Sequence, residues 1–368
     1  MGNYKGEDDQ LKNIYVRLVK IKAVLMLSFT FRYRTRDITK NFPPTVGIRM
    51  INEDLSDKFH VINLFTTAGE LQLEILQSGK MIIRERSDAG SAAVEVSHDK
   101  QKHRSIDPDK SYLKALGITD SEGNVFKRAQ DKYKQINHYI ELLSPLMRDF
   151  VGKINHVADM GSGKGYLTFA LYDYLNTVLM SNVKVTGVEF RQDLVDLCNS
   201  IANSSGFKQL DFIQGSIQSY KSDKIDMLIA LHACDTATDD AIYQGIQSRS
   251  KLIIVAPCCH KQIRKQMENA KVTNDLSFLT RYGIFLERQA EMVTDGIRAL
   301  ILEYSGYKTK VFEFISDEHT PKNVLVVGIK TKDPAVNKKK ELLQQIKETK
   351  AYFGIDHHHL EKLLNLNM

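Results

Sequence analysis

The 368-residue chain has little cysteine, no tryptophan and no long apolar run. Four cysteines are too few for a disulfide framework and favour a reducing compartment, so we expect a cytoplasmic protein. A membrane-spanning helix needs roughly 18 consecutive apolar residues, whereas the longest runs here, 23–27 and 227–231, stop at five. The opening residues, MGNYKGEDDQ, hold no apolar stretch of the kind that directs export. These absences argue against secretion, a disulfide-stapled miniprotein and a membrane partner.

The chain is mildly basic, with 51 Lys and Arg against 45 Asp and Glu and a net charge of +6. The excess is concentrated between Arg17 and Arg49, where eight basic residues accompany one acid. A local excess of this kind says more about a binding surface than the small net charge does.

Length and pattern predict two domains. Residues 11–86 are rich in Val, Ile, Phe and Tyr and partly alternate at period two, which predicts strands. Further along, a helical stretch that we expect to end near Pro145 is followed by short apolar runs that alternate with further helical stretches. This pattern predicts a mostly parallel sheet covered by helices on both faces. The expected organisation is a β-rich substrate-recognition domain over 1–86, a polar linker over 87–125, an α/β domain over 126–335 and a helical tail over 336–368.

A glycine-rich turn follows the first short apolar run of the α/β domain. Asp159 stands two residues before the first of three alternating glycines, Gly161, Gly163 and Gly165. Glycine lets the backbone turn sharply and lets a ligand approach, and the helix that follows offers free N–H groups at its N-terminus. The spacing fits neither a dinucleotide site, whose third glycine would fall at Tyr166, nor a phosphate-binding P-loop. A carboxylate before the loop would repel a pyrophosphate but attract the ammonium group of a methionine moiety.

A second acid, Glu189, ends the next predicted strand, where it can accept hydrogen bonds from ribose hydroxyls. The two acids and the loop between them predict a binding site for S-adenosylmethionine (SAM) of the class I methyltransferase type. The alternative is a glycine turn that binds no ligand. We expect further cofactor contacts from the loop and from the ends of later strands: Ser162, Tyr166, Ser216, Ile217 and Leu231.

Cysteines, histidines and acids gather at the ends of the next two predicted strands, in LHACDTATDD and APCCHKQIRK. The carboxyl ends of neighbouring parallel strands meet at one edge of a sheet, so these residues should lie close together. They are His232, Cys234, Asp235, Asp239, Cys258, Cys259, His260 and Lys261.

Four interpretations of this cluster are open. His260, His232 or Asp235 could position and deprotonate an acceptor hydroxyl. Cys258 or Cys259 could attack C6 of a pyrimidine to activate C5. The cysteines with a histidine could bind zinc, or the small residues could simply pack beside the cofactor. Because the cysteines are vicinal and the usual C-x2-C spacing is missing, we expect no metal.

Residues from about 130 to 330 resemble a branch of class I methyltransferases that shares an H-x-C-x-x-A-T-D element and a Cys-Cys-His element, here 232–239 and 258–260. A K-x-x-Q element at 132–135 is also similar. The branch includes eukaryotic tRNA acceptor-stem 2′-O-methyltransferases and the methyltransferase-like domain found beside glutathione S-transferase C-terminal modules. The whole chain resembles a bacterial family with HDKQKHR-like and EHTPKN-like elements. It lacks the N-terminal zinc-finger cysteines of the tRNA enzymes.

The resemblance implies a Rossmann-like seven-stranded class I methyltransferase domain, an α/β fold, behind a β-rich N-terminal domain. It implies a SAM-dependent methyltransferase acting on RNA, either tRNA or rRNA, with a ribose 2′-hydroxyl as the favoured acceptor. The sequence itself indicates no obligate protein partner. The alternatives are a small-molecule or protein methyltransferase, an RNA C5-pyrimidine enzyme using Cys258 or Cys259, and a non-catalytic SAM- or RNA-binding protein. The substrate contacts that it implies are Lys132, Gln135, Asp239, Lys261, His319 and Asn323.

A basic segment in the N-terminal domain is a second candidate for substrate binding. In FTFRYRTR, aromatic residues alternate with Arg32, Arg34 and Arg36. On a strand, the two sets would point to opposite faces. The arginines could bind RNA phosphates, or they could simply be the solvated face of a strand whose aromatic face is core.

Overall fold

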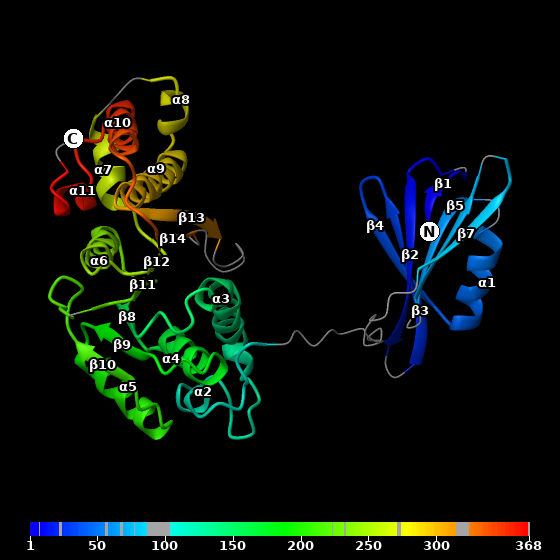
Figure 1. Cartoon of the computed structure of the whole chain (residues 1–368), viewed down its shortest axis with the longest axis horizontal. Coiled ribbons are helices and arrows are strands. Elements are labelled where there is room, and N and C mark those ends of the chain that lie inside the picture. Colours follow the sequence, from blue (N-terminus) through cyan, green and yellow to red (C-terminus); the bar gives the residue numbers. More distant parts are fainter. Residues whose placement is uncertain are drawn as a thin grey trace. The chain divides into compact units, whose positions relative to one another are not determined.

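The computed structural model describes the chain except for residues 7, 22–23, 56–57, 67–68, 77, 87–103, 223, 232, 271–273, 314–323 and 367–368. The chain divides into two compact units, Met1–His103 and Arg104–Met368, which we call the N-terminal unit and the C-terminal unit. In Figure 1 the N-terminal unit is blue, and the C-terminal unit runs from cyan to red.

The N-terminal unit consists of two antiparallel sheets and one helix. One sheet has the strand order β1-β5-β6-β7 and the other has the order β2-β3-β4. The elements are β1 (Gly2–Tyr4), β2 (Leu11–Ile21), β3 (Val24–Tyr33), β4 (Asp37–Phe42), α1 (Pro44–Leu55), β5 (Phe59–Thr66), β6 (Gly69–Ile75) and β7 (Met81–Arg86). The predicted β-rich front of the chain is confirmed.

Alternation along β3 separates an apolar face from a polar one. Phe29 is buried, and the Phe31 ring packs beside it with a centroid distance of 6.1 Å. Arg32, which points the other way, is exposed and stands opposite Asp37 of β4. The aromatic side chains therefore form the core of this unit, as their spacing predicts.

The C-terminal unit is built on a seven-stranded sheet with the order β10-β9-β8-β11-β12-β14-β13. The strands are β8 (His156–Met160), β9 (Lys184–Glu189), β10 (Leu210–Gln214), β11 (Met227–Ala230), β12 (Leu252–Val255), β13 (Tyr307–Glu313) and β14 (Val324–Lys330). The first five are parallel, and β14 runs antiparallel to both of its neighbours. The expected Rossmann-like, seven-stranded α/β fold is confirmed. Because the strand order reverses beside β8, the carboxyl ends of β8, β9 and β11 are where a ligand is expected.

Helices cover both faces of this sheet. Val157 of β8 packs with the core that includes α3, α4 and α5, whereas the next residue, Ala158, faces the core that includes α6, α7 and α9. The helices are α2 (Ser111–Ala115), α3 (Gln130–Arg148), α4 (Tyr166–Asp173), α5 (Gln192–Ser204), α6 (Thr236–Gln247), α7 (Lys261–Ala270), α8 (Ser277–Thr280), α9 (Gly283–Tyr304), α10 (Val336–Phe353) and α11 (His359–Leu363), with the helical turns η1 (Lys127–Ala129) and η2 (Tyr174–Val178). Among the described residues, none of these helices has the length and apolarity to cross a bilayer.

The expected linker over 87–125 extends too far, because the chain joins the C-terminal unit from residue 104 onward. The Tyr133 hydroxyl donates to the Ile106 carbonyl at 2.6 Å, and the Ile106 N–H donates to the Asn137 side chain at 3.1 Å. Ile106 and Tyr112 are fully buried. These apolar residues are scattered among polar ones, so they form no period that sequence analysis could detect.

Packing also decides where α3 ends and how the C-terminal helices are held. Helix α3 continues through Pro145 to Arg148 rather than ending there. Pro145 has no N–H to donate within the helix, but Leu146 and Met147, which follow it, are buried in the core and hold the last turn in place. The expected C-terminal tail is helical, and Ile346 of α10 and Leu360 of α11 are buried in the same core as α6 and α9. The tail is therefore an integral part of the C-terminal unit.

Candidate functional site

The glycine loop connects β8 to α4 and lies against the end of β9. The N–H groups of Gly161 and Ser162 both donate to the Val188 carbonyl, at 2.8 and 3.1 Å. Gly161 and Gly163 adopt left-handed φ angles of 77° and 56°, and within the described part of the chain no atom lies within 4 Å of where a Cβ would stand on either. A ligand can therefore approach the bare backbone at both positions.

Gly165 is constrained by packing instead. It also has a left-handed φ angle, 70°, but a Cβ there would lie 2.9 Å from the Phe169 ring and 3.1 Å from the Phe212 ring. This glycine lets α4 begin close to the sheet, so that the N-terminus of α4 points toward the loop.

Asp159 is the penultimate residue of β8, just before the loop. It is 5% exposed, and the Thr168 hydroxyl donates to its Oδ2 at 2.5 Å. Burial raises the pKa of Asp159 to about 6, although the hydrogen bond from Thr168 lowers it in part. A cation that reached this carboxylate would offset the desolvation of its charge.

Glu189 ends β9 on the other side of the loop. Its Oε2 accepts a hydrogen bond from the Gly163 N–H at 2.9 Å, and its Oε1 accepts one from the Arg191 N–H at 3.0 Å. The Glu189 carbonyl accepts from the Gly215 N–H at 3.0 Å, which brings the end of β10 beside it. Ser216, which is exposed, and the half-buried Ile217 follow directly.

The K-x-x-Q element lies on α3 beside the start of α4. The Lys132 ammonium donates to the Gln135 side chain at 2.7 Å and lies 5.4 Å from the centre of the Tyr166 ring. Burial lowers the pKa of Lys132. The structure thus brings Lys132, Gln135 and Tyr166 together, whereas Leu231, which follows β11, is buried in the core.

These residues fit SAM. The acid at the end of β8 is buried, the loop has two open backbone faces, and Glu189 already accepts a hydrogen bond from the loop. The Ser162 hydroxyl is also buried without a hydrogen-bond partner among the described residues.

The comparison with protein families agrees with this site. Residues 131–266 match the family model described as a methyltransferase domain. The chain contains a SAM-dependent methyltransferase domain. SAM is the methyl donor of this domain, and the matched segment includes the glycine loop, Glu189 and the strand ends with the cysteines.

The curated relatives are distant. The glutathione S-transferase C-terminal domain-containing protein of Mus musculus is 25% identical over 234 residues, and the Homo sapiens protein is 22% identical over 234 residues. Each match covers 58% of this chain and 35% of the relative, so the chain spans about a third of the length of these relatives.

Solved structures that match part of the chain include Aeropyrum pernix fibrillarin with natively bound SAM, at 10% identity over 73% of this chain and 99% of that chain, with a TM-score of 0.36. An rRNA methylase from Streptococcus thermophilus is 13% identical, covering 51% of this chain and 95% of that chain, with a TM-score of 0.32.

Three cysteine thiols meet at the ends of β11 and β12. The sulfur of Cys234 lies 2.9 Å from that of Cys258, which lies 3.8 Å from that of Cys259. Burial and the two neighbouring cysteines raise the pKa of Cys258 to about 12. Such a thiol is protonated at neutral pH, which disfavours Cys258 as a free nucleophile.

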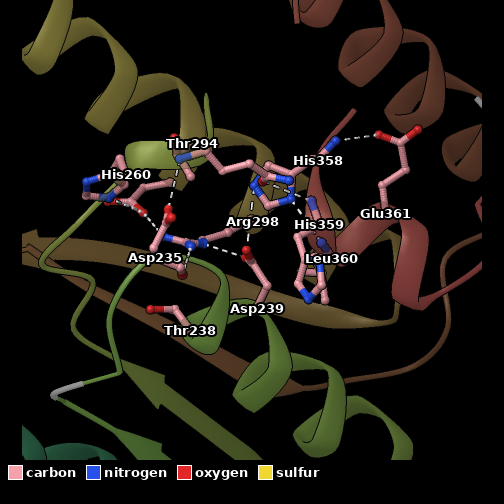
Figure 2. Close-up of polar contacts among 12 residues, drawn as sticks. Asp235, Thr238, Asp239, His260, Thr294, Arg298, His358, His359, Leu360 and Glu361 are labelled. Carbon is pink, nitrogen blue, oxygen red and sulfur yellow. Dashed lines mark hydrogen bonds and ion pairs between the residues drawn. The ribbon is translucent and has the colours of Figure 1, made fainter. Parts of the chain in front are cut away.

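A buried polar network fixes the same two strand ends. Figure 2 draws Arg298 of α9 at its centre, with His260 to one side and His358 to the other. Arg298 is fully buried and donates to Asp239 at 2.7 Å, to Asp295 at 3.0 Å and to the Asp235 carbonyl at 2.9 Å. Burial alone would lower the pKa of Arg298, but the two carboxylates raise it well above its ordinary value.

The network engages three residues that sequence analysis assigned to the acceptor side. His260 is 3% exposed, and its Nε2 lies 3.2 Å from the Asp295 carboxylate. Asp239 is 1% exposed and is paired with Arg298. Asp235 accepts a hydrogen bond from the Gln262 N–H at 3.1 Å at the start of α7. These side chains hold β11 and β12 to α7 and α9, and Asp239 is not placed to touch a substrate.

The sequence analysis missed Arg298, Asp295 and the C-terminal contribution to this network. His358 lies 4.0 Å from Asp239, and His359 contacts Asp240 at 3.0 Å. Burial lowers the pKa of His358 to about 4, so this side chain is neutral. In the sequence, the α9 side of the network is marked by an arginine within the apolar stripe of that helix, but the partners of this arginine are distant along the chain.

The remaining predicted site residues are scattered. Lys261 is exposed at the first position of α7. In the N-terminal unit, Arg32 pairs with Asp37 at 3.0 Å, while Arg34 and Arg36 are exposed in the turn between β3 and β4. His232, His319 and Asn323 lie outside the described residues.

Proposed function

We propose that this protein transfers the methyl group of SAM to RNA, with a ribose 2′-hydroxyl as the acceptor. The observation that supports it best is the pairing of the glycine loop with Glu189, whose carboxylate lies 2.9 Å from the Gly163 nitrogen. When bound, SAM supplies a methyl group already activated by the sulfonium. The protein has then to hold donor and acceptor in line and to assist the loss of one proton.

On the donor side, Asp159 and Glu189 divide the binding between the two ends of the cofactor. The buried Asp159 carboxylate would attract the ammonium group of the methionine moiety, and Glu189 would accept hydrogen bonds from the ribose hydroxyls. Ser216 and Ile217, which the Gly215 contact brings next to Glu189, would flank the adenine.

On the acceptor side, Lys132 is the side chain best placed to hold the reacting oxygen. It donates to the Gln135 side chain and lies 5.4 Å from the Tyr166 ring, which directly follows the glycine loop, and its positive charge would lower the pKa of an acceptor hydroxyl placed there. His260 and Asp235, by contrast, are engaged in the buried network and act by positioning the strand ends.

RNA as the substrate is supported by exposed arginines of the N-terminal unit. The antiparallel register places Tyr15, which is 47% exposed, opposite Thr30 on the same face of the sheet as Arg32, and the Arg32 guanidinium lies 5.0 Å from the Tyr15 ring. Arg34 and Arg36 extend the positive charge into the adjoining turn. Guanidinium groups beside an exposed ring can bind phosphates and stack on a base.

The test is transfer of tritiated methyl from SAM into separated RNA, protein and small-molecule fractions of a cell extract. Label in RNA that survives as alkali-resistant dinucleotides is expected, because a methylated 2′-oxygen cannot attack the neighbouring phosphate. Label on pyrimidine C5 would favour the thiolate route, and label in protein or small molecules would refute RNA as the substrate. SAM binding without any labelled product would indicate a non-catalytic protein.

The contribution of the arginines is measured separately. RNA binding should weaken steeply with salt, and the triple variant Arg32→Ala, Arg34→Ala, Arg36→Ala should lower that slope. Arg84→Ala, which removes an exposed guanidinium paired with Glu74 in the other sheet, is the matched control. An unchanged slope in the triple variant would refute this surface.

A further inference from the structure

We propose that Cys234, Cys258 and Cys259 form a binding site for zinc, which links the ends of β11 and β12. The three sulfur atoms all lie within 4.8 Å of one another. They come from two different loops, so a bound cation would cross-link strand ends that are far apart in sequence.

The spacing of the sulfurs suits a tetrahedral ion. At a zinc–sulfur distance of about 2.3 Å, two thiolates on one ion lie about 3.8 Å apart. Cys258 and Cys259 have this separation, 3.8 Å, so the vicinal pair can reach one ion. Cys234 and Cys258 lie 2.9 Å apart and would need to separate by about 1 Å. Three thiolates fill three of four positions and leave the last for water or another ligand.

Zinc binds the thiolate form of cysteine, so binding at this site would release the protons of the three thiols. Helix α6 begins two residues after Cys234, and helix α7 begins two residues after Cys259. The N-terminus of a helix has a partial positive charge, which partly offsets the mutual repulsion of three thiolates once the metal has displaced their protons. A divalent cation then neutralises most of the charge of the three thiolates.

The site is also rigidly held. Asp235, the residue after Cys234, has a φ of 54° and a ψ of −121°, a strained conformation for a residue other than glycine. Its carbonyl is fixed by Arg298 and its carboxylate by the Gln262 N–H at the start of α7. On the other loop, the His260 ring is held by Asp295. The network thus holds the two cysteine-bearing loops in fixed positions. Metal sites need ligands that are held in place in this way, whereas packing beside the cofactor would not need it.

The experiment uses the full chain, kept reduced and stripped of metal with a chelator, and titrated with Co²⁺ in the absence of SAM. We expect thiolate-to-cobalt charge-transfer absorption that saturates at one ion per chain and is abolished when Zn²⁺ displaces the cobalt. Cys234→Ala, Cys258→Ala and Cys259→Ala should each lose most of this absorption. Cys198→Ala is the matched control, because Cys198 lies on α5 in the core and is not part of the trio.

A second measurement uses only the wild-type chain, so it does not depend on how the variants fold. Zn²⁺ should slow alkylation of Cys234, Cys258 and Cys259, mapped by peptide mass spectrometry, and leave the rate at Cys198 unchanged. The proposal is refuted if the reduced chain binds no cobalt, if Cys198→Ala loses as much absorption as the other variants, or if Zn²⁺ protects no thiol. If the reduced chain binds no cobalt, and removal of the reductant in air then yields a Cys234–Cys258 disulfide with dioxygen as the oxidant, the short sulfur contact serves oxidation instead. Because SAM is absent throughout, the result is independent of the methyltransferase reaction.

Discussion

Replacing Arg298 by methionine should destabilise the C-terminal unit severely. The guanidinium is fully buried and donates to Asp239, Asp295 and the Asp235 carbonyl at 2.7, 3.0 and 2.9 Å. Arg298→Met keeps much of the side-chain volume but leaves two carboxylates in the core without their cation. Removing one partner of a buried ion pair costs about 3–5 kcal/mol.

Calorimetry of the full chain measures this loss. In a unit of this size, each kcal/mol lowers the melting temperature by about 2–4 °C, so the transition of the C-terminal unit should fall by roughly 6–20 °C. Arg191→Met is the matched control, since its guanidinium pairs with Asp193 at 2.8 Å on the surface and should contribute nothing measurable. Equal melting temperatures for the two variants would refute the structural role of the network.

The pH dependence gives an independent check. Burial alone would raise the pKa of Asp239, but Arg298 and the neighbouring histidines lower it below its ordinary value. The folded chain therefore holds this carboxylate ionised, and the stabilisation is present above pH 3.8, the pKa of a free Asp side chain, and is lost as the pH falls through the lowered value. The gap in stability between wild type and Arg298→Met should be full at neutral pH and should narrow in acid.

Further predictions concern Asp159, Glu189 and Gly165 at the SAM site. Because the folded pKa of Asp159 is raised from 3.8 to about 6, the ligand-free chain should lose stability as the pH rises between these values, and Asp159→Asn should remove this dependence in pH-resolved melts. In calorimetric titrations, SAM affinity should rise with pH through about 6 for wild type but not for Asp159→Asn. Glu189→Gln should weaken SAM binding roughly 10- to 100-fold through loss of charge-assisted hydrogen bonds, whereas Asp193→Asn, an exposed neighbour, should not. Gly165→Ala should destabilise the chain more than Gly152→Ala in denaturant titrations. Both glycines have left-handed φ angles, but only a Cβ added at Gly165 would meet aromatic rings, at 2.9 and 3.1 Å. Equal losses of stability would refute the packing role of Gly165.

The donor side could be predicted well from the sequence because its determinants are local. Asp159 and the three glycines lie within seven consecutive residues, and Glu189 ends the next strand. Strand, loop and helix follow one another along the chain, so spacing alone places the acid and the bare backbone on the same edge of the sheet.

The acceptor side could be predicted only in part. The sequence brought the three cysteines to neighbouring strand ends, but it could not give the 2.9 Å and 3.8 Å sulfur distances. It also offered His260 and Asp239 as residues facing a substrate, whereas the fold buries both against α9.

The sequence by itself therefore determined the β-rich front, the alternating α/β order and the acid–glycine loop, since each depends on neighbours a few residues apart. Only the tertiary structure decided what becomes of the charged residues near the cysteines. Arg298 lies 59 residues from Asp239, and His358 approaches from the far end of the chain. A buried charge needs a partner wherever the fold can supply one, and no pattern along the chain indicates which distant residue that will be.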